Sequence, residues 1–406
     1  MPSLLDTADA FRKEEADEVS VTPTAEETGD TLVLSGDWPV RVDKDYGDFI
    51  EFFGYSKDEW EVEDPGTMSK WAQSKRLENG DRDVVWLYAY RGVKFRRITD
   101  EDQENRELLQ EAIERTQTWS APIRRTLGKP MGEPVTYVHL QGDEQTGAYE
   151  GGGIAGLAAR EEAALEKSLN YLAQLMSRGV NVEAIADCST GDRVENIAGH
   201  YENQPRMAAP MRDQYRYAVE AEVTRLKAFA DFGLPVIAPR TPSNHGEHRA
   251  GKGMSPFTSD RDNLDLQIAE SVKFVLDQGP LGQQIEWHIP DDDYLTGFDL
   301  SGVNCGLTHG HKIPGSGTAS IEKWTLAQRD RLAFHHDVKM RVLFMGHKHH
   351  LMAQELSGTT VIMAPSLDGG SAWFTASSGQ QSTPGLVGLT VGLGHSMGWG
   401  NLNPLR

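Results

Sequence analysis

The stretch MRVLFMGHKHH, residues 340–350, joins a short apolar run to a glycine and three histidines. The run 340–345 predicts a buried β-strand, and the histidines follow at the point where that strand ends. In an extended loop His347 and His349 point to the same side, because side chains two residues apart share a face. The stretch therefore predicts a strand that carries a pair of imidazole ligands at its carboxyl end.

Four further predicted strands end in polar side chains that can bind a cation. The strands span 135–140, 182–186, 235–239 and 303–308, and they are followed by Asp143 and Gln145, by Asp192, by Asn244 and His245, and by His309 and His311. Gly-Asp and Asn-His pairs are common in ordinary turns, so each signal alone is weak. Open α/β sheets bind ligands at the carboxyl ends of their strands. Five such ends in one chain predict a shared metal site, and donors without sulfur suit two divalent ions such as Mn²⁺, Mg²⁺, Zn²⁺ or Fe.

The order of the predicted elements gives the fold class. Helical periodicity over 156–179, 206–232 and 262–277 separates the first apolar runs, whereas the strands after residue 284 follow one another closely. Alternating strands and helices predict parallel strands with crossover helices, and closely spaced strands predict hairpins. We expect an α/β fold, a sandwich of two sheets flanked by helices.

Composition divides the chain into segments. Residues 1–31 contain nine acidic and two basic residues, which predicts an acidic tail with too few apolar side chains to fold. The aromatic-rich residues 32–120 predict a small N-terminal α+β module, and 121–134 read as a linker because prolines and glycines interrupt any period. Residues 135–395 would form the main domain and 396–406 a C-terminal tail.

Charge and cysteine content narrow the class of protein. The 406 residues include 61 acidic and 40 basic ones, a formal net charge of −21, which disfavours binding polyanions over the whole surface but allows a local basic groove. The only cysteines, Cys188 and Cys305, are too few for a disulfide framework or a thiolate zinc site. The chain shows no apolar run of membrane-spanning length and no secretory start, so we expect a cytoplasmic protein without a membrane partner.

The order of these motifs resembles the calcineurin-like metallophosphoesterase superfamily over residues 134–395. The segments PSNHGEHR (242–249), DDD (291–293), GHKHH (346–350) and APSLDGGSAWF (364–374) look like phage-encoded members described as similar to the double-strand-break repair exonuclease. The resemblance implies a metal-dependent phosphoesterase, first of all a DNA exonuclease or endonuclease, in which two divalent ions, Mn²⁺ foremost, activate a bridging hydroxide. It also implies the host cytoplasm if the chain is phage-encoded, and it allows a homodimer.

The resemblance assigns a role to each matching position. By this carry-over the first metal is held by Asp143, Gln145 and His349, both metals are bridged by Asp192, the second metal is held by Asn244, His309 and His347, and the catalytic histidine is His245. Three positions depart from the family pattern. Gln145 stands where a histidine is usual, Ser243 replaces a glycine, and Gly246 replaces an acidic residue that commonly orients the catalytic histidine.

Several neighbouring residues compete for roles in this site. Asp187 lies near Asp192 and ranks second as the bridging ligand, because it ends an apolar run without a preceding glycine turn. Glu247 is a candidate to orient His245 in place of the missing acid. Glu195 is either an acceptor for a histidine of the site or a solvated side chain.

Three classes of substrate or function remain open at the level of sequence. DNA is favoured by the basic residues Arg91, Lys94, Arg96 and Arg97, which lie in an aromatic strand and could contact phosphates. An ordinary amphipathic strand with solvated charges explains the same residues equally well. A phosphatase or phosphodiesterase for phosphoproteins or nucleotides fits the metal site as well, and Gln145 motivates a third class, a binding protein with impaired catalysis.

Overall fold

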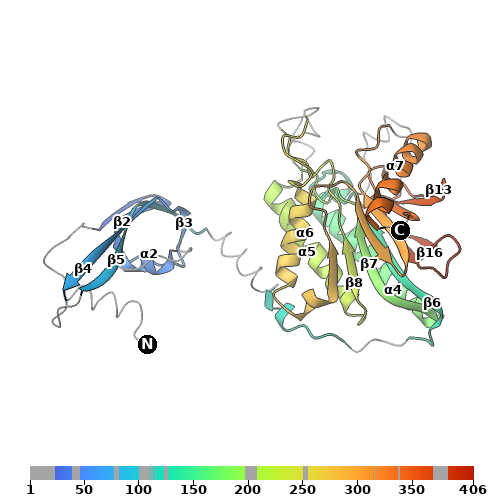
Figure 1. Ribbon diagram of the computed structural model, residues 1–406, viewed down its shortest axis with the longest axis horizontal. Coiled ribbons are helices and arrows are strands. Elements are labelled where there is room, and N and C mark those ends of the chain that lie inside the picture. The colour runs from blue at the N-terminus through green and yellow to red at the C-terminus, as the bar shows by residue number, and fades with distance from the viewer. Residues whose placement is uncertain are drawn as a thin grey trace. The chain divides into compact units, whose positions relative to one another are not determined.

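A computed structural model describes residues 23–38, 46–76, 82–99, 110, 113–114, 116–122, 127–196, 208–249, 255–315, 317–336, 339–368 and 383–406. The chain divides into two compact units, Met1–Glu111 and Ala112–Arg406 (Figure 1). Most of the predicted acidic tail and Arg124 and Arg125 of the predicted linker lie outside the described residues. Where the chain is described, no helix is both long and apolar enough to span a bilayer.

The larger unit contains a six-stranded sheet with the order β16-β15-β6-β7-β8-β9. Its parallel strands are β6 (Met131–Gln141), β7 (Val180–Ser189), β8 (Val236–Pro239) and β9 (Ile285–His288). Parallel neighbours need crossover connections, and these contain the helices α4 (Gly153–Ser177), α5 (Met211–Ala230) and α6 (Leu264–Leu276), and the short helices η1 (Glu150–Gly152) and η3 (Pro280–Gln284).

A second, five-stranded sheet has the order β10-β11-β12-β14-β13. Its strands are β10 (Thr296–Leu300), β11 (Val303–Thr308), β12 (Val342–Met345), β13 (Met352–Leu356) and β14 (Thr359–Met363). The strands β11, β12 and β14 are parallel, and helix α7 (Thr318–His336) lies between β11 and β12 in the chain. The two outer strands pair antiparallel through short connections.

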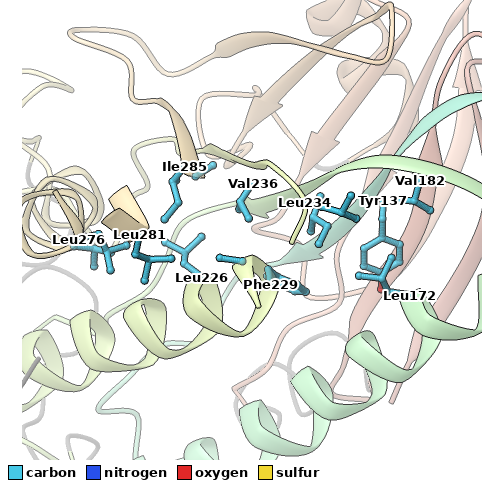
Figure 2. Packing of buried hydrophobic residues seen from close by; sticks show 14 of the residues in the cluster. Tyr137, Leu172, Val182, Leu226, Phe229, Leu234, Val236, Leu276, Leu281 and Ile285 are labelled. Carbon is cyan, nitrogen blue, oxygen red and sulfur yellow. The ribbon is translucent and has the colours of Figure 1, made fainter. Parts of the chain in front are cut away.

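Buried apolar clusters hold the larger unit together. Val138, Ala186 and Phe344 belong to a buried cluster between the two sheets. On the other face of the first sheet, side chains of α4, α5 and α6 pack on its strands, where Figure 2 shows Leu226 and Phe229 of α5 close to the sheet. A third cluster joins α7 to the second sheet. The structure therefore has the expected α/β class, two stacked sheets with helices outside, and both faces of each central strand are buried as parallel strands require.

Two segments expected as tails or as part of the N-terminal module are structured differently. Residues 399–405 form β16 (Trp399–Leu405), which pairs antiparallel with β15 (Leu386–Val391) at the edge of the first sheet. Leu405 is buried and Trp399 packs on the cluster between the sheets, so this strand is held by burial that its polar, Pro-containing sequence did not reveal. Trp119 packs into the main core of the larger unit, beyond the end of the N-terminal module.

The described part of the N-terminal unit contains a five-stranded antiparallel sheet and a short helix. Its elements are β1 (Thr24–Thr28), β2 (Thr31–Trp38), α2 (Gly47–Phe52), β3 (Trp60–Asp64), β4 (Thr67–Arg76) and β5 (Arg82–Arg97). The helix covers the sheet through a core that includes Leu34, Phe49 and Phe95. Strand β1 falls within the predicted acidic tail: all five of its residues are exposed and it is held by backbone pairing to β2, which composition cannot predict.

Candidate metal centre

The loops after β7, β8, β11 and β12 bring one half of the predicted site together. Ligand atoms of Asp192, His309 and His347 all lie within 4.8 Å of one another. His309 Nε2 is 2.8 Å from Asn244 Oδ1, 3.1 Å from His347 Nδ1 and 3.2 Å from Asp192 Oδ2. The four residues assigned to the second metal, the bridging aspartate included, therefore form one contiguous group.

The tautomer of His309 is set by a hydrogen bond on the side of the ring away from this group. Its Nδ1–H donates to the Thr190 carbonyl at 2.8 Å, so Nε2 is the ring nitrogen that faces Asp192, Asn244 and His347. Burial lowers the pKa of His309, but the charge of Asp192 raises it, with a net value of about 9. A proton on Nε2 or a metal ion would satisfy the neighbouring Asp192 oxygen, and the donor set suits a divalent ion.

The loops after β6 and β12 assemble the other half of the site. The Asp143 carboxylate accepts the backbone N–H of His347 at 3.0 Å, and its Oδ1 is 3.3 Å from His349 Nε2. Gln145 Nε2 lies 3.4 Å from the same nitrogen of His349. The other ring nitrogen of His349 is 3.3 Å from Asp368 Oδ2, so Asp368 can orient the imidazole. The residues assigned to the first metal also lie together, with an amide in place of the usual imidazole.

An unusual backbone conformation marks most of these ligands. The residues with positive φ include Asp143 (55°), Gln145 (45°), Asp192 (55°), His347 (70°) and His349 (54°). Residues other than glycine rarely adopt this region, and it costs free energy that surrounding contacts must offset. Such strain gathers at functional sites, so it is an observation independent of residue type that points to the same loops.

The predicted catalytic histidine lies beside the bridging carboxylate. The backbone N–H of His245 donates to Asp192 Oδ1 at 3.0 Å, and His245 Nε2 is 3.8 Å from Asp192 Oδ2. The Nδ1–H donates to the Glu195 carbonyl at 3.0 Å, and Glu195 Oε1 lies 3.5 Å from the same nitrogen. Glu195 therefore lies where it can orient the His245 ring, and Nε2 is the nitrogen on the side of Asp192.

Glu247 does not orient His245, contrary to the alternative considered from sequence. Its carboxylate binds Arg249 and lies 3.1 Å from Lys312 Nζ and 3.5 Å from His311 Nε2. Asp260 lies 2.8 Å from the same Lys312 ammonium. Glu247, Asp260 and His311 are close enough to hold a cation, but the ammonium of Lys312 already contacts both carboxylates and the guanidinium of Arg249 also pairs with Glu247.

Asp187 is excluded as the bridging ligand because it is committed to buried ion pairs. Its carboxylate accepts from Arg225 Nε at 2.8 Å and from Arg240 Nη2 at 2.7 Å. These two cations hold the pKa of Asp187 well below its usual range despite its burial. Asp187 therefore supports the carboxyl end of β7 beneath the site.

Asp265 and Asp368 contact the ligand loops but were not singled out from the sequence. Asp265, in the first turn of α6, accepts the backbone N–H groups of Asp192 and Arg193. Asp368 follows β14 and contacts His349. A short acidic side chain at a helix start usually indicates capping, and Asp-Gly-Gly usually indicates a turn, so neither residue had a signal of its own.

The four basic residues proposed to bind substrate differ in their surroundings within the N-terminal unit. Arg91 and Lys94 of β5 are exposed. Arg96 forms an ion pair with Glu61. Arg97 lies 2.9 Å from Glu27 and its guanidinium lies 4.6 Å from the centre of the Trp60 ring. Two of the four cations are therefore engaged by partners within the unit.

Comparisons with known proteins give a likeness of fold. No protein-family model matches the chain, and no curated protein matches its sequence. Similar solved structures include an archaeal phosphodiesterase, with 11% identity and a TM-score of 0.29, over 66% of this chain and 99% of that one. Another is zinc-bound Vps29 from Entamoeba histolytica, with 11% identity and a TM-score of 0.26, over 62% and 84% of the two chains.

A predicted phosphoesterase from Streptococcus pneumoniae matches with 11% identity and a TM-score of 0.25, over 64% of this chain and 84% of that one. Scores this low carry no conclusion about activity. The function proposed below rests on the geometry of the site.

Proposed function

We propose that this chain is a phosphoesterase that depends on two divalent metal ions, and that its substrate is a phosphodiester of DNA. The observation that carries the proposal is the buried Asp192 carboxylate, with His309 Nε2 at 3.2 Å on one oxygen and the His245 backbone N–H on the other. Loops from five strands place imidazole, amide and carboxylate donors around it. Two divalent ions held by such donors would stabilise the attacking and leaving oxygens of a phosphate ester.

The donor set fits two ions that share Asp192. Asp143, Gln145 and His349 would hold one ion, and Asn244, His309 and His347 the other. When bound, the pair would supply positive charge that stabilises the phosphate and lowers the pKa of a water. Asp192 has two oxygens and is buried, so water screens its negative charge only weakly and each oxygen could attract a cation.

In this proposal His245 donates the proton to the leaving group. Its Nδ1–H is committed to the Glu195 carbonyl, so only Nε2 can give a proton to an oxygen that departs from phosphorus. Proton donation of this kind contributes about 10²–10⁴ in rate.

The choice of DNA as substrate is supported by charge placement and by the motif order. A chain with a net charge of −21 needs concentrated positive charge to hold a polyanion, and Arg91 and Lys94 present two exposed cations on one strand. Arg96 and Arg97 form ion pairs with Glu61 and Glu27, which reduces the positive charge available to bind DNA. This favours a second candidate, a phosphodiesterase or phosphatase for nucleotides or phosphoproteins.

The proposal is tested by metal-dependent hydrolysis with the full-length chain. Protein stripped by a chelator and reloaded with Mn²⁺, Mg²⁺ or Zn²⁺ is assayed on bis(4-nitrophenyl) phosphate, 4-nitrophenyl phosphate, and linear and circular DNA. We expect diester and DNA cleavage that requires added metal. His245→Asn should reduce the rate about 10²–10⁴-fold while metal binding persists, and His288→Asn on β9 serves as the matched control.

Hydrolysis of the monoester or of nucleotides without DNA cleavage would favour the second candidate. Absence of hydrolysis with every metal and substrate would contradict the proposal.

A further inference from the structure

One carboxylate on α6 connects two loops of the metal centre. Asp265 Oδ1 accepts the backbone N–H of Arg193 at 2.9 Å, and its Oδ2 accepts the backbone N–H of Asp192 at 3.3 Å. The hydroxyl of Ser243 donates to the same Oδ2. Because Asp192 follows β7 and Ser243 follows β8, the Asp265 side chain joins the loop of the bridging ligand to the loop of Asn244.

Ser243 is bound on both sides of its hydroxyl. Its Oγ donates to Asp265 and accepts the backbone N–H of Gly246 at 3.2 Å. The Ser243 carbonyl accepts the side-chain amide of Asn263 at 2.8 Å. These bonds close the four-residue turn 243–246, which presents Asn244 and His245 to the site. A glycine at 243, the residue usual in the family that this chain resembles, has no hydroxyl to do this.

The carboxylate of Asp265 is not needed to cap its own helix. Asn263 is the N-cap residue of α6, and its side chain already accepts the backbone N–H of Asp265. Asp265 is buried, and its negative charge lies close to that of Asp192, an arrangement that packing alone would avoid. The side chain is therefore best explained by the three donors that it accepts from the ligand loops.

The turn formed by Gly191 and Asp192 packs closely against Ser243 and Asp265. Gly191 has a φ of 91°, and a Cβ added there would lie 2.8 Å from Ser243 Cβ and 3.5 Å from Asp265 Oδ2. Gly191 therefore allows the turn to approach Ser243 and Asp265 at a distance that any side chain would prevent.

We propose that Ser243 and Asp265 form a clamp that fixes Asp192 relative to Asn244 and thereby sets the affinity of the site for its second metal ion. The inference rests on the proposed function, because it assigns these ligands to a metal. Both members are positioning residues, since they act through Asp192 and Asn244. Residues that orient metal ligands typically change metal affinity about 10–100-fold when they are replaced.

The clamp is tested with Asp265→Asn, Ser243→Ala and the double variant in the full-length chain. Asp277→Asn, at the other end of α6, is the matched control. Mn²⁺ binding is followed by calorimetry and by the electron paramagnetic resonance of free Mn²⁺, and thermal unfolding is recorded without metal. Asp265→Asn should weaken Mn²⁺ binding at the second metal site, the tighter of the two, about 10–100-fold and Ser243→Ala less. The double variant should bind Mn²⁺ no more weakly than Asp265→Asn, because both changes remove the same bond between Ser243 and Asp265.

The clamp is contradicted if Asp265→Asn and Ser243→Ala bind Mn²⁺ like the control, or if they lower only the unfolding temperature and leave the binding constants unchanged. Should Asp265→Asn fail to fold, Ser243→Ala decides alone, since it removes a single hydroxyl. A wild-type chain that binds no Mn²⁺ would instead overturn the proposed function, and the clamp with it. A wild-type chain that binds two ions, beside variants without a change in affinity, would overturn the clamp alone.

Discussion

At the scale of residues, the ligand loops hold each other in a conformation that none would adopt alone. Left-handed backbone at a non-glycine residue costs of order 1–3 kcal/mol. The Asp143 carboxylate offsets this by accepting the His347 N–H, and the Gln145 N–H donates to the Asp192 carbonyl at 2.8 Å. The site is therefore preorganised by hydrogen bonds between its own ligands, which favours metal binding over rearrangement.

Gln145 should be the weak point of the first metal site. An amide is a poorer donor for Mn²⁺ or Zn²⁺ than imidazole, so the first ion should bind less tightly than the second. Gln145→His should lower the Mn²⁺ concentration for half-maximal activity by about tenfold, a response typical of changes in the ligand environment. Gln278→His, on an exposed residue after α6, is the control. An unchanged Mn²⁺ requirement in Gln145→His would show that position 145 is not a ligand.

At the scale of elements, buried ion pairs join helix α5 to the strand ends below the site. Glu222 of α5 binds Arg193, which follows Asp192, and accepts from Arg240 Nε at 2.8 Å. Arg225 of the same helix binds Asp187 at the end of β7. Removing one partner from such a buried set costs about 3–5 kcal/mol, because the other charge is left uncompensated. The network joins α5 to the ends of β7 and β8, where the loops of Asp192 and Asn244 begin.

His139 of β6 extends this polar chain and should make stability depend on pH. Its ring bonds Ser168 Oγ at 2.8 Å and Gln141 Oε1 at 2.7 Å, and burial lowers its pKa from 6.5 to about 4. The unfolded chain therefore binds more protons between these two pH values, so the stabilisation is complete above about pH 6.5 and is lost as the pH falls toward 4.

Urea unfolding at several pH values measures this effect. The free energy of unfolding of wild type should fall by about 1.4 kcal/mol per pH unit from His139 alone within that window. His139→Gln should remove this part of the slope. A slope in His139→Gln equal to that of wild type would contradict the assignment.

Much of this element scale was predictable from the sequence, and the exceptions have physical causes. The apolar runs before Asp143, Asp192, Asn244, His309 and His347 predicted buried strands, because burial on both faces leaves a continuous apolar signature. The contacts of Asp265 and Asp368 could not be predicted, since they join segments distant in sequence. Left-handed backbone at the ligands has no signature in residue type, and β16 is an edge strand whose stability comes from its neighbour.

At the scale of the whole molecule, a strongly acidic chain contains exposed cations on one strand of its N-terminal unit. If DNA is the substrate, Arg91 and Lys94 should neutralise phosphates, and binding should weaken with salt. Replacing both by Gln should weaken DNA binding and reduce the slope of log affinity against log salt by about 2. Hydrolysis of a small diester should stay near the wild-type rate, because it needs only the metal centre.

Lys57→Gln in the same unit is the control for that measurement, since Lys57 is exposed and paired with Glu51. A salt slope unchanged by the Arg91 and Lys94 replacements would remove the N-terminal unit from DNA binding. Loss of small-diester hydrolysis in the same variant would show instead that these residues support the fold.

The central claim, two metal ions bridged by Asp192 and required for hydrolysis, is tested most directly by metal content and activity in Asp192→Asn. The substitution keeps the volume of the side chain but removes the charge that both ions share. The account predicts two Mn²⁺ per wild-type chain, fewer than two in Asp192→Asn, and hydrolysis of bis(4-nitrophenyl) phosphate reduced to background. Wild-type activity in Asp192→Asn, or a wild-type chain that hydrolyses the diester after complete removal of metal, would contradict it.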